Sequence, residues 1–414
     1  MDIEYYEWAR LSQPVFPAFP EARRPLHLRI AHKVQDFLDE LNIPRLFYKT
    51  LAYSYVLVIL WCFYLLVSLP QRSNHEVQQL PDDFPVFSQE FDNYYETFKV
   101  SSGCHLREGD LYIAPNASVP GKDRKPFCAT RKELLTEMSK GETRSPNTPW
   151  VVPECHYHWY SMAEICMILG RFDTIIFVGD TDLQNIYNGF NILLRKDLVK
   201  GTLATWDMDW ASQSQCLCEK QFSRPSCAGS WVTSSEQVPR LTRGLYRGNP
   251  YICDRSTTHA FLRHSSASTT LLSRDVLARF KALLDPPIPR PRSKRVAVIY
   301  SASPVPVSLP TDLVLASMLE FKKALFFSRR VRRSRATLWV GPGGAAGPRE
   351  LDADADAELR AFDDDMADAA RRNGIDVLSM RNLTARAWGP GGPRSAEKLA
   401  ITQAMMVFNW LDSL

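Results

Sequence analysis

The sequence predicts an α/β fold: a three-layer domain with a parallel sheet, preceded by a single N-terminal transmembrane helix. Two observations lead to this prediction. Residues 50–70 form an apolar segment without one charged side chain, in an otherwise polar chain of 414 residues. From about residue 150 onward, short apolar runs alternate with segments whose apolar residues recur every three or four positions. Strands that alternate with helices in this way are typical of a parallel sheet covered on both faces.

The apolar segment 50–70 is long enough to cross a bilayer, because about 20 residues rising 1.5 Å each span roughly 30 Å of hydrocarbon. A helix in the core of a soluble protein would carry a polar stripe, and this segment carries none. It also lies too far from Met1 to be a cleaved signal peptide. We therefore expect a signal anchor, with the lipid bilayer as the partner of 50–70.

Charge and cysteine content predict which side of the membrane each part occupies. Lys33, Arg45 and Lys49 precede the segment within 20 residues, and only Arg72 follows it within 20. Because basic residues remain on the cytosolic side of a span, residues 1–49 are expected to be a cytosolic tail. Of the nine cysteines, eight follow the segment, an even number that suits disulfides in an oxidising lumen. The sequence thus predicts a single-pass type II protein.

The charge balance and two N-glycosylation sequons indicate what the part of the chain after residue 49 binds and carries. Of 50 Lys and Arg and 46 Asp and Glu residues, seven of each lie in 1–49, so 43 basic and 39 acidic residues follow it. This small excess does not predict a nucleic-acid partner. Two N-glycosylation sequons lie on the expected lumenal side, and we predict a glycan at Asn116, with Asn382 as the second acceptor.

The lumenal chain divides into a stem and a domain. Residues 71–150 mix Pro, Ser, Asp, Glu and Gly, and they are expected to form a lumenal stem that Cys104 and Cys128 tie down in part. The domain itself is expected over 151–414. A polar, cysteine-rich stretch without a hydrophobic period, 205–265, is interpreted as a disulfide-tied insertion in this domain.

The elements of the domain follow from two hydrophobic periods. Continuous apolar runs predict buried parallel strands. These runs lie at 174–178, 296–300, 338–340 and 375–378. Apolar residues at spacings of three and four predict helices. The helices are expected at 163–169, 183–194, 311–327, 352–372 and 396–414, the last one amphipathic with Leu399, Met406, Trp410 and Leu411 on its buried side.

The clearest local signal is Phe177-Val178-Gly179-Asp180-Thr181, which ends the first strand just before a helix. Sites in open α/β sheets form outside the carboxyl ends of the strands, and a helix N-terminus offers free N–H groups to negative charge. Asp180 and Thr181 are therefore candidate catalytic residues. The alternative is structural, because Thr181 and Asp182 are residue types that cap a helix.

This turn resembles the SGNH (GDSL-type) hydrolases, in particular the membrane-anchored PC-esterase and trichome-birefringence-like group and its fungal relatives. In that group a Phe-Val-Gly-Asp-Ser turn carries the nucleophile. The resemblance spans roughly 153–414, and includes the Cys-rich segment before the turn and the final helix from Glu397-Lys398-Leu399 to Asn409-Trp410-Leu411. It implies a domain that acts on glycans in the Golgi or endoplasmic reticulum membrane, with the plasma membrane as the alternative.

The departures from this family are as informative as the match. Thr181 stands at the position of the nucleophilic Ser. An Asp-x-x-His element before the final helix supplies the acid and the base in such families, and Gly391 and Arg394 occupy those two positions here. No histidine follows His264. Because a triad without two or three of its members loses orders of magnitude in rate, the resemblance implies a degenerate member.

Three further patterns have alternative interpretations. If the alignment of the final helix is wrong, a replacement base would come from His156, His158, His259 or His264. The pair His156 and His158 beside Cys155 has the residue types of a metal site, but the even cysteine count favours a disulfide, so neither a metal nor a cofactor is expected. The basic run 329–335 is interpreted as a solvated helix end, with a contact to an acidic glycan as the alternative.

Three functions are compatible with these patterns. The first is a degenerate SGNH-like protein that binds glycans or a partner without turnover. The second is an active glycan O-acyl esterase or O-acetyltransferase in which Thr181 is the nucleophile. The third is a non-catalytic scaffold that recruits other membrane enzymes. The missing histidine near the final helix favours the first.

Overall fold

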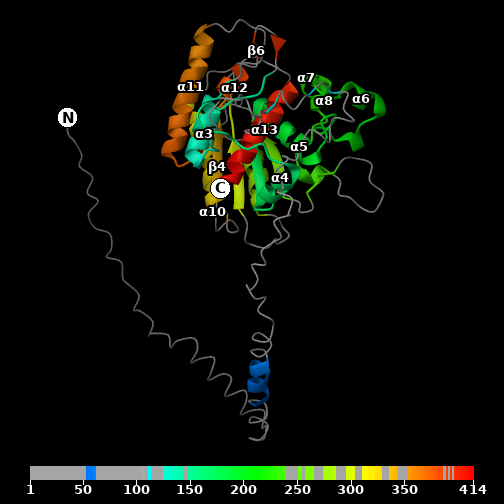
Figure 1. Cartoon of the computed structure of the whole chain (residues 1–414), viewed down its shortest axis with the longest axis vertical. Coiled ribbons are helices and arrows are strands. Elements are labelled where there is room, and N and C mark those ends of the chain that lie inside the picture. Colours follow the sequence, from blue (N-terminus) through cyan, green and yellow to red (C-terminus); the bar gives the residue numbers. More distant parts are fainter. Residues whose placement is uncertain are drawn as a thin grey trace, which may run out of the picture. The chain divides into compact units, whose positions relative to one another are not determined.

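The structure is a computed structural model, shown in Figure 1. It describes residues 53–61, 104, 106, 111–112, 125–142, 148–238, 250–253, 257–264, 274–285, 295–303, 310–328, 335–343, 353–385, 388–389, 392–393 and 396–414. The chain divides into two compact units, Met1–Ser88 and Gln89–Leu414, and each is described by itself.

In the first unit, the described residues form one helix over 53–61. Its large apolar side chains are exposed, for example Leu57 at 65%. Within the described part of the chain, no helix has both the length and the apolar character that a membrane crossing requires. The remainder of the predicted anchor 50–70, including Cys62, lies outside the described residues.

The second unit is built on a parallel sheet of five strands in the order β2-β1-β3-β4-β5. The strands are β1 Phe172–Gly179, β2 Thr258–Arg263, β3 Arg295–Tyr300, β4 Arg335–Val340 and β5 Asp376–Leu378. The predicted α/β class and parallel sheet are thus confirmed. This strand order is shared by flavodoxin-like doubly wound sheets.

Helices cover both faces of this sheet, because successive strand residues point to opposite sides. Phe177 packs on the face that carries α3 Arg131–Lys140, α4 Met162–Leu169, α5 Thr181–Arg195 and α13 Ala396–Asp412. Val178 packs on the other face, which carries α9 Arg274–Leu284, α10 Thr311–Phe327 and α11 Ala353–Arg372. The bounds of α10 coincide with the predicted helix 311–327.

Residues 205–265 contain more structure than the predicted insertion. They include short helices, η3 Thr205–Asp207, α6 Trp210–Gln215, α7 Lys220–Ser223, α8 Pro225–Ala228 and η4 Ser235–Gln237. The interpretation of the whole stretch as unpatterned is wrong at its end, where β2 forms an edge of the sheet. The sequence of β2, Thr-His-Ala-Phe-Leu-Arg, lacks the continuous apolar run expected of a buried strand, although five of its six residues are buried.

The eight cysteines after the apolar segment are all paired, which confirms the prediction of disulfides. The pairs are Cys104–Cys218, Cys128–Cys155, Cys166–Cys253 and Cys216–Cys227. One pair, Cys216–Cys227, lies inside the stretch 205–265. Two others join Cys218 and Cys253 of this stretch to Cys104 and Cys166, which lie earlier in the chain. They therefore stabilise the segments that have the fewest long apolar patterns.

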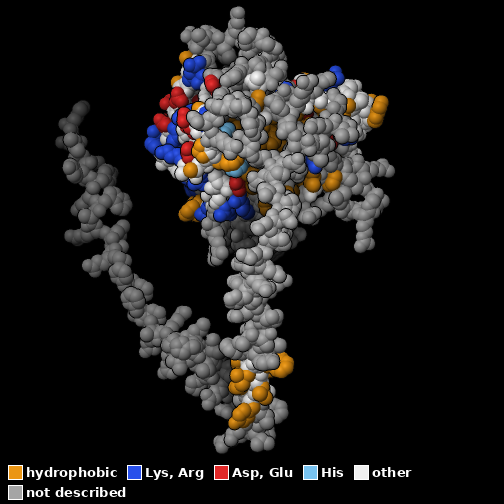
Figure 2. All heavy atoms as spheres, in the orientation of Figure 1, with side chains coloured by type: hydrophobic (Ala, Val, Ile, Leu, Met, Phe, Trp, Pro, Cys, Tyr) orange, Lys and Arg blue, Asp and Glu red, His pale blue; other side chains and the backbone are white. Residues whose placement is uncertain are grey.

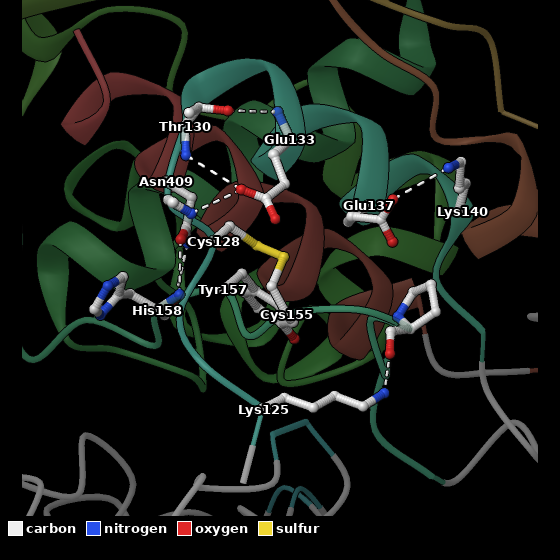
Figure 3. The surroundings of a disulfide bond; sticks show 12 residues. Lys125, Cys128, Thr130, Glu133, Glu137, Lys140, Cys155, Tyr157, His158 and Asn409 are labelled. Carbon is white, nitrogen blue, oxygen red and sulfur yellow. Dashed lines mark hydrogen bonds and ion pairs between the residues drawn. A yellow bond between two sulfur atoms is a disulfide. The ribbon is translucent and has the colours of Figure 1, made fainter. Parts of the chain in front are cut away.

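Part of the predicted stem 71–150 is packed into the second unit. Helix α3 begins with a capping box in which Thr130 and Glu133 exchange hydrogen bonds, and the Cys128–Cys155 disulfide lies next to it (Figure 3). The side chain of Asn409, on α13, bonds both backbone groups of His158 at 2.7 and 2.8 Å. Ordered structure thus begins well before the predicted domain boundary at residue 150.

Helix α13 differs from the predicted amphipathic helix, because it is buried on all sides. Residues from Ala400 to Leu411 are buried without exception, whereas Leu399, predicted on the buried side, is partly exposed. The helix packs closely on α5: a Cβ on Gly189 would lie 2.2 Å from the carbonyl oxygen of Ala400. Between β5 and α13 lie α12 Arg381–Ala385 and the short antiparallel strands β6 Trp388–Gly389 and β7 Gly392–Pro393.

Candidate functional site at the carboxyl edge of the sheet

The strand order places the candidate site between β1 and β3. The chain passes from β1 to β2 on one side, and then crosses to β3 on the other side. This reversal makes the carboxyl ends of β1 and β3 the topological switch point, where open α/β sheets bind ligands. Asp180 follows β1 and Ser301 to Ser303 follow β3, so the predicted motif lies at this point.

Asp180 is the helix cap and joins the two strand ends. Its Oδ1 accepts hydrogen bonds from the backbone N–H groups of Asp182 and Leu183, at 3.1 and 3.4 Å. Its Oδ2 accepts the N–H of Ser303 at 2.7 Å. The alternative interpretation placed the cap on Thr181 and Asp182. The structure corrects it by one position, because the carboxylate of Asp180 reaches the free N–H groups of the first turn.

Thr181 is exposed at the first position of α5. Among the described residues, no hydrogen bond joins its hydroxyl to a histidine or any other base. Gly391 and Arg394, which stand at the positions of the family's Asp and His, lie outside the described residues. Of the predicted catalytic residues, Asp180 and Thr181 thus lie at this edge of the sheet.

Asp182 is a carboxyl group of strongly perturbed acidity at this edge. Its carboxyl approaches the loop after β4, where it accepts a hydrogen bond from the backbone N–H of Gly343. A Cβ built on Gly343 would lie 3.4 Å from Asp182 Oδ2. Burial, together with the repulsion of Asp180, raises the pKa of Asp182 from 3.8 to about 7, and the Gly343 bond opposes this rise. The site thus holds a carboxyl that changes charge near neutral pH.

His264 is the one replacement-base candidate that lies at this edge. It follows β2, and its backbone N–H donates to Gly179 at 2.7 Å. Its Nε2 is 3.1 Å from the hydroxyl of Ser317, which accepts a hydrogen bond from Tyr300 at 3.1 Å. The Ser317 hydroxyl thus connects Tyr300 to the imidazole of His264. Burial lowers the pKa of His264, and the charge of Asp180 opposes this effect.

The other three candidate histidines have different surroundings, and only His259 is buried. His259, on β2, is buried, and its Nδ1 is 2.9 Å from the hydroxyl of Tyr187 on α5. Burial lowers the pKa of His259 to about 3. His158 stacks on Phe127, with ring centroids 3.9 Å apart. His156 lies beside Cys155, whose disulfide with Cys128 removes the thiolate that a metal would need.

The start of α13 is where the family resemblance places the missing acid and base. Glu219, from the insertion, accepts the backbone N–H groups of Ala396 and Glu397 at 2.8 and 3.1 Å. Burial and the nearby Glu219 raise the pKa of Glu397 to about 8. This helix end is thus capped by a distant carboxylate, and the described residues there contain no histidine.

The glycosylation sequons have different positions. Asn116 lies outside the described residues. Asn382 lies on α12, where its Nδ2 donates to the carbonyl of Ser139 at 3.0 Å. The hydroxyl of Thr384, the third residue of this sequon, is bonded to the carbonyls of Met380 and Arg381. Glycosylation at both positions stays a prediction.

Comparisons with known proteins do not assign this chain to a family. No protein-family model matches the chain, and no match is found among curated proteins. Among the described residues, no group of three or more His, Cys, Asp or Glu side chains could hold a metal ion. The residues that sequence reasoning missed are Gly343 and Ser317, because nothing in the local sequence around Asp182 or His264 indicates these distant partners.

Proposed function

We propose that this chain is a single-pass type II membrane protein of the secretory pathway whose SGNH-like domain binds glycans without turning them over. The proposed location is the Golgi or endoplasmic reticulum membrane, with the plasma membrane as the alternative. The apolar segment 50–70 would be the anchor, and the disulfides agree with an oxidising compartment.

One observation carries the non-catalytic part of this proposal. The nucleophile position holds an exposed threonine, and the histidine at the same edge is bonded to Ser317 instead. A hydroxyl is a weak nucleophile without an adjacent base that removes its proton. The polar groups of this edge would therefore bind a ligand through hydrogen bonds rather than attack it.

The experiment that tests this proposal is hydrolysis of an activated acetyl ester by the purified full chain. We expect the rate to equal that of buffer, for the protein and for Thr181→Ala alike. A rate well above buffer that disappears in Thr181→Ala would show that the domain is an active hydrolase.

Glycan binding needs its own measurement, on an array of acetylated and free polysaccharides. We expect Thr181→Trp, which places a large side chain at the carboxyl edge, to weaken binding. Ala211→Trp, at an exposed position of α6, is the matched control and should bind as the wild type does. Equal binding by all three proteins would exclude this edge as the glycan site.

A second candidate, an active O-acyl esterase or acyltransferase, has one observation in its favour. Asp182 follows Thr181 directly, and its carboxyl, with a pKa of about 7, could accept a proton near neutral pH. In that case ester hydrolysis would be detected, and both Thr181→Ala and Asp182→Asn would abolish it.

A further inference from the structure

The amino edge of the sheet carries basic side chains beside exposed aromatic rings. Arg295 begins β3 and Arg335 begins β4, and the pairing of Val296 with Arg335 places the two strand starts side by side. Helix α10 ends at the same edge, because it runs back from the carboxyl end of β3 to the start of β4. Figure 2 shows basic and apolar side chains together at the end of the folded unit where Figure 1 labels α10.

The last turn of α10 exposes two adjacent phenylalanines. Phe326 is 63% exposed and Phe327 is 69% exposed. The guanidinium carbon of Arg335 lies 4.7 Å from the centroid of the Phe326 ring, in a cation–π contact. Lys323, one turn earlier, is also exposed. We name the surface made of Lys323, Phe326, Phe327, Arg295 and Arg335 the amino-edge face.

The sequence around this face is strongly basic. Residues 321–348 contain seven Lys and Arg and no acidic residue, and residues 286–310 contain four and no acidic residue. Asp285 is an acidic neighbour, and its Oδ1 accepts a hydrogen bond from Ser328 at 3.3 Å.

We propose that the amino-edge face docks on the surface of a phospholipid bilayer. Arginines bind lipid phosphates, and adjacent apolar rings enter the boundary between headgroups and acyl chains. An acidic glycan would satisfy the arginines equally well. It would cover at most one face of each phenylalanine ring, whereas an acyl layer removes both rings from water and gains more free energy.

This inference rests on the membrane anchor of the proposed function. The 33 residues of 71–103 separate the apolar segment from the first disulfide cysteine, and an extended chain of that length reaches on the order of 100 Å. The domain could therefore reach the bilayer by either edge. Docking by the amino-edge face would leave the carboxyl edge, with Asp180 and Thr181, open to a ligand.

The test is tryptophan quenching in the full chain, reconstituted in nanodiscs that contain lipids with brominated acyl chains. Phe327→Trp places a reporter in the face, and Leu313→Trp places one at the opposite end of the same helix, where Leu313 is 38% exposed. We expect the added fluorescence of Phe327→Trp to be quenched at least about twofold more than that of Leu313→Trp, since docked rings lie within the acyl boundary. Arg335→Gln in the Phe327→Trp protein should reduce this quenching.

Equal quenching of the two reporters would overturn the docking proposal. A response of Phe327→Trp to polygalacturonate in detergent, without quenching by bromolipids, would overturn it in favour of an acidic glycan. Anchoring is measured separately, by elution of the chain with the nanodiscs. If the chain does not elute with them, the anchor fails, and docking is decided by adding vesicles of the same bromolipids to the chain in solution.

Discussion

The two edges of one sheet differ in the side chains that they present. At the carboxyl edge, Asp180, Asp182 and His264 follow strands or begin a helix, and each is bonded to another part of the protein. At the amino edge, Arg295 and Arg335 begin strands, and exposed phenylalanines lie beside them. The fold itself favours this difference, because helices begin at the carboxyl edge, where acidic side chains are stabilised, and end at the amino edge, where basic side chains are stabilised.

This contrast separates groups that order the fold from groups that face outward. The carboxylate of Asp180 joins β1 to the residue Ser303 after β3, and the carboxyl of Asp182 joins α5 to the loop after β4. Such groups stabilise the edge in the absence of any ligand. Lys323 and the two phenylalanines of the amino-edge face are exposed instead, so the contribution of this face is expected in binding rather than in folding. The predictions below test this division, beginning with the largest effect.

The largest expected effect comes from Asp182→Asn. In the folded protein the pKa of Asp182 is about 7, against an ordinary value of 3.8, so between these pH values the folded state holds a proton that the unfolded chain has lost. Stability therefore falls as the pH rises from about 4 to about 7. Asn keeps an oxygen for the Gly343 N–H and cannot ionise. We expect it to raise the free energy of unfolding at pH 8 by up to about 4 kcal/mol.

The measurement is urea unfolding of the variant and the wild type at pH 4 and pH 8. At pH 4 the difference should be small, because the carboxyl is protonated in the folded wild type. Asp364→Asn, at an exposed position of α11, is the matched control. An equal gain at both pH values would show that the change in stability has a cause other than ionisation.

The next effect concerns the close approach of β1 and β3 at the switch point. A Cβ on Gly179 would lie 2.5 Å from the carbonyl oxygen of Ser301 and 2.9 Å from a methyl of Leu183. We expect Gly179→Ala to lower the free energy of unfolding by about 3 kcal/mol, since the backbone must move. Gly229→Ala, which meets nothing within 4 Å, should be neutral in the same urea titration. A neutral Gly179→Ala would contradict the tight edge described here.

Asp180→Ala is expected to cost about 1 to 2 kcal/mol, because it removes the cap of α5 and the bond to Ser303. It also removes the charge that repels the Asp182 carboxylate, so the pKa of Asp182 should fall. The pH dependence of unfolding would then move to lower pH. If the cost appears without this movement, the two carboxyls do not interact as the structure indicates.

Much of the fold was predictable from the sequence, and the reasons are local. The α10 helix has its expected bounds because apolar side chains with a helical period fill one face of the sheet. Strand β2 was not predicted, because the polar His259 interrupts its apolar run. His259 is nevertheless buried, and the hydroxyl of Tyr187, 72 residues away, is a hydrogen-bond partner for its ring. A pattern read along the chain does not contain such a partner.

The candidate site shows the same limit. The sequence places Asp180 and Thr181 at a strand end, and the structure brings them to the switch point. The acidity of Asp182 depends on burial and on Gly343, which is 161 positions further along the chain. The bond between Asp180 and Ser303 likewise depends on the crossing from β2 to β3, which brings the ends of β1 and β3 together. Chemistry that arises from tertiary contacts is not encoded in local spacing.

At the amino edge, Arg335→Gln should change stability by less than about 1 kcal/mol, the range of an exposed cation–π contact. The same is expected of Phe327→Ser, because a side chain that is already 69% exposed loses little on truncation. Urea unfolding of both variants measures this directly. A loss of several kcal/mol would place these side chains among the groups that hold the fold, and the contrast between the two edges would disappear.

The smallest expected effect is that of Thr181→Ala. The side chain is exposed at the first position of α5, and Asp180 rather than Thr181 makes the cap, so stability should change by no more than about 0.5 kcal/mol. Thr181→Ser should be equally silent in ester hydrolysis, since a serine without an adjacent base is also a weak nucleophile. If Thr181→Ser hydrolyses the ester while the wild type does not, a base is present within reach of residue 181. The methyl group of threonine, rather than a missing histidine, would then be the reason for the inactivity.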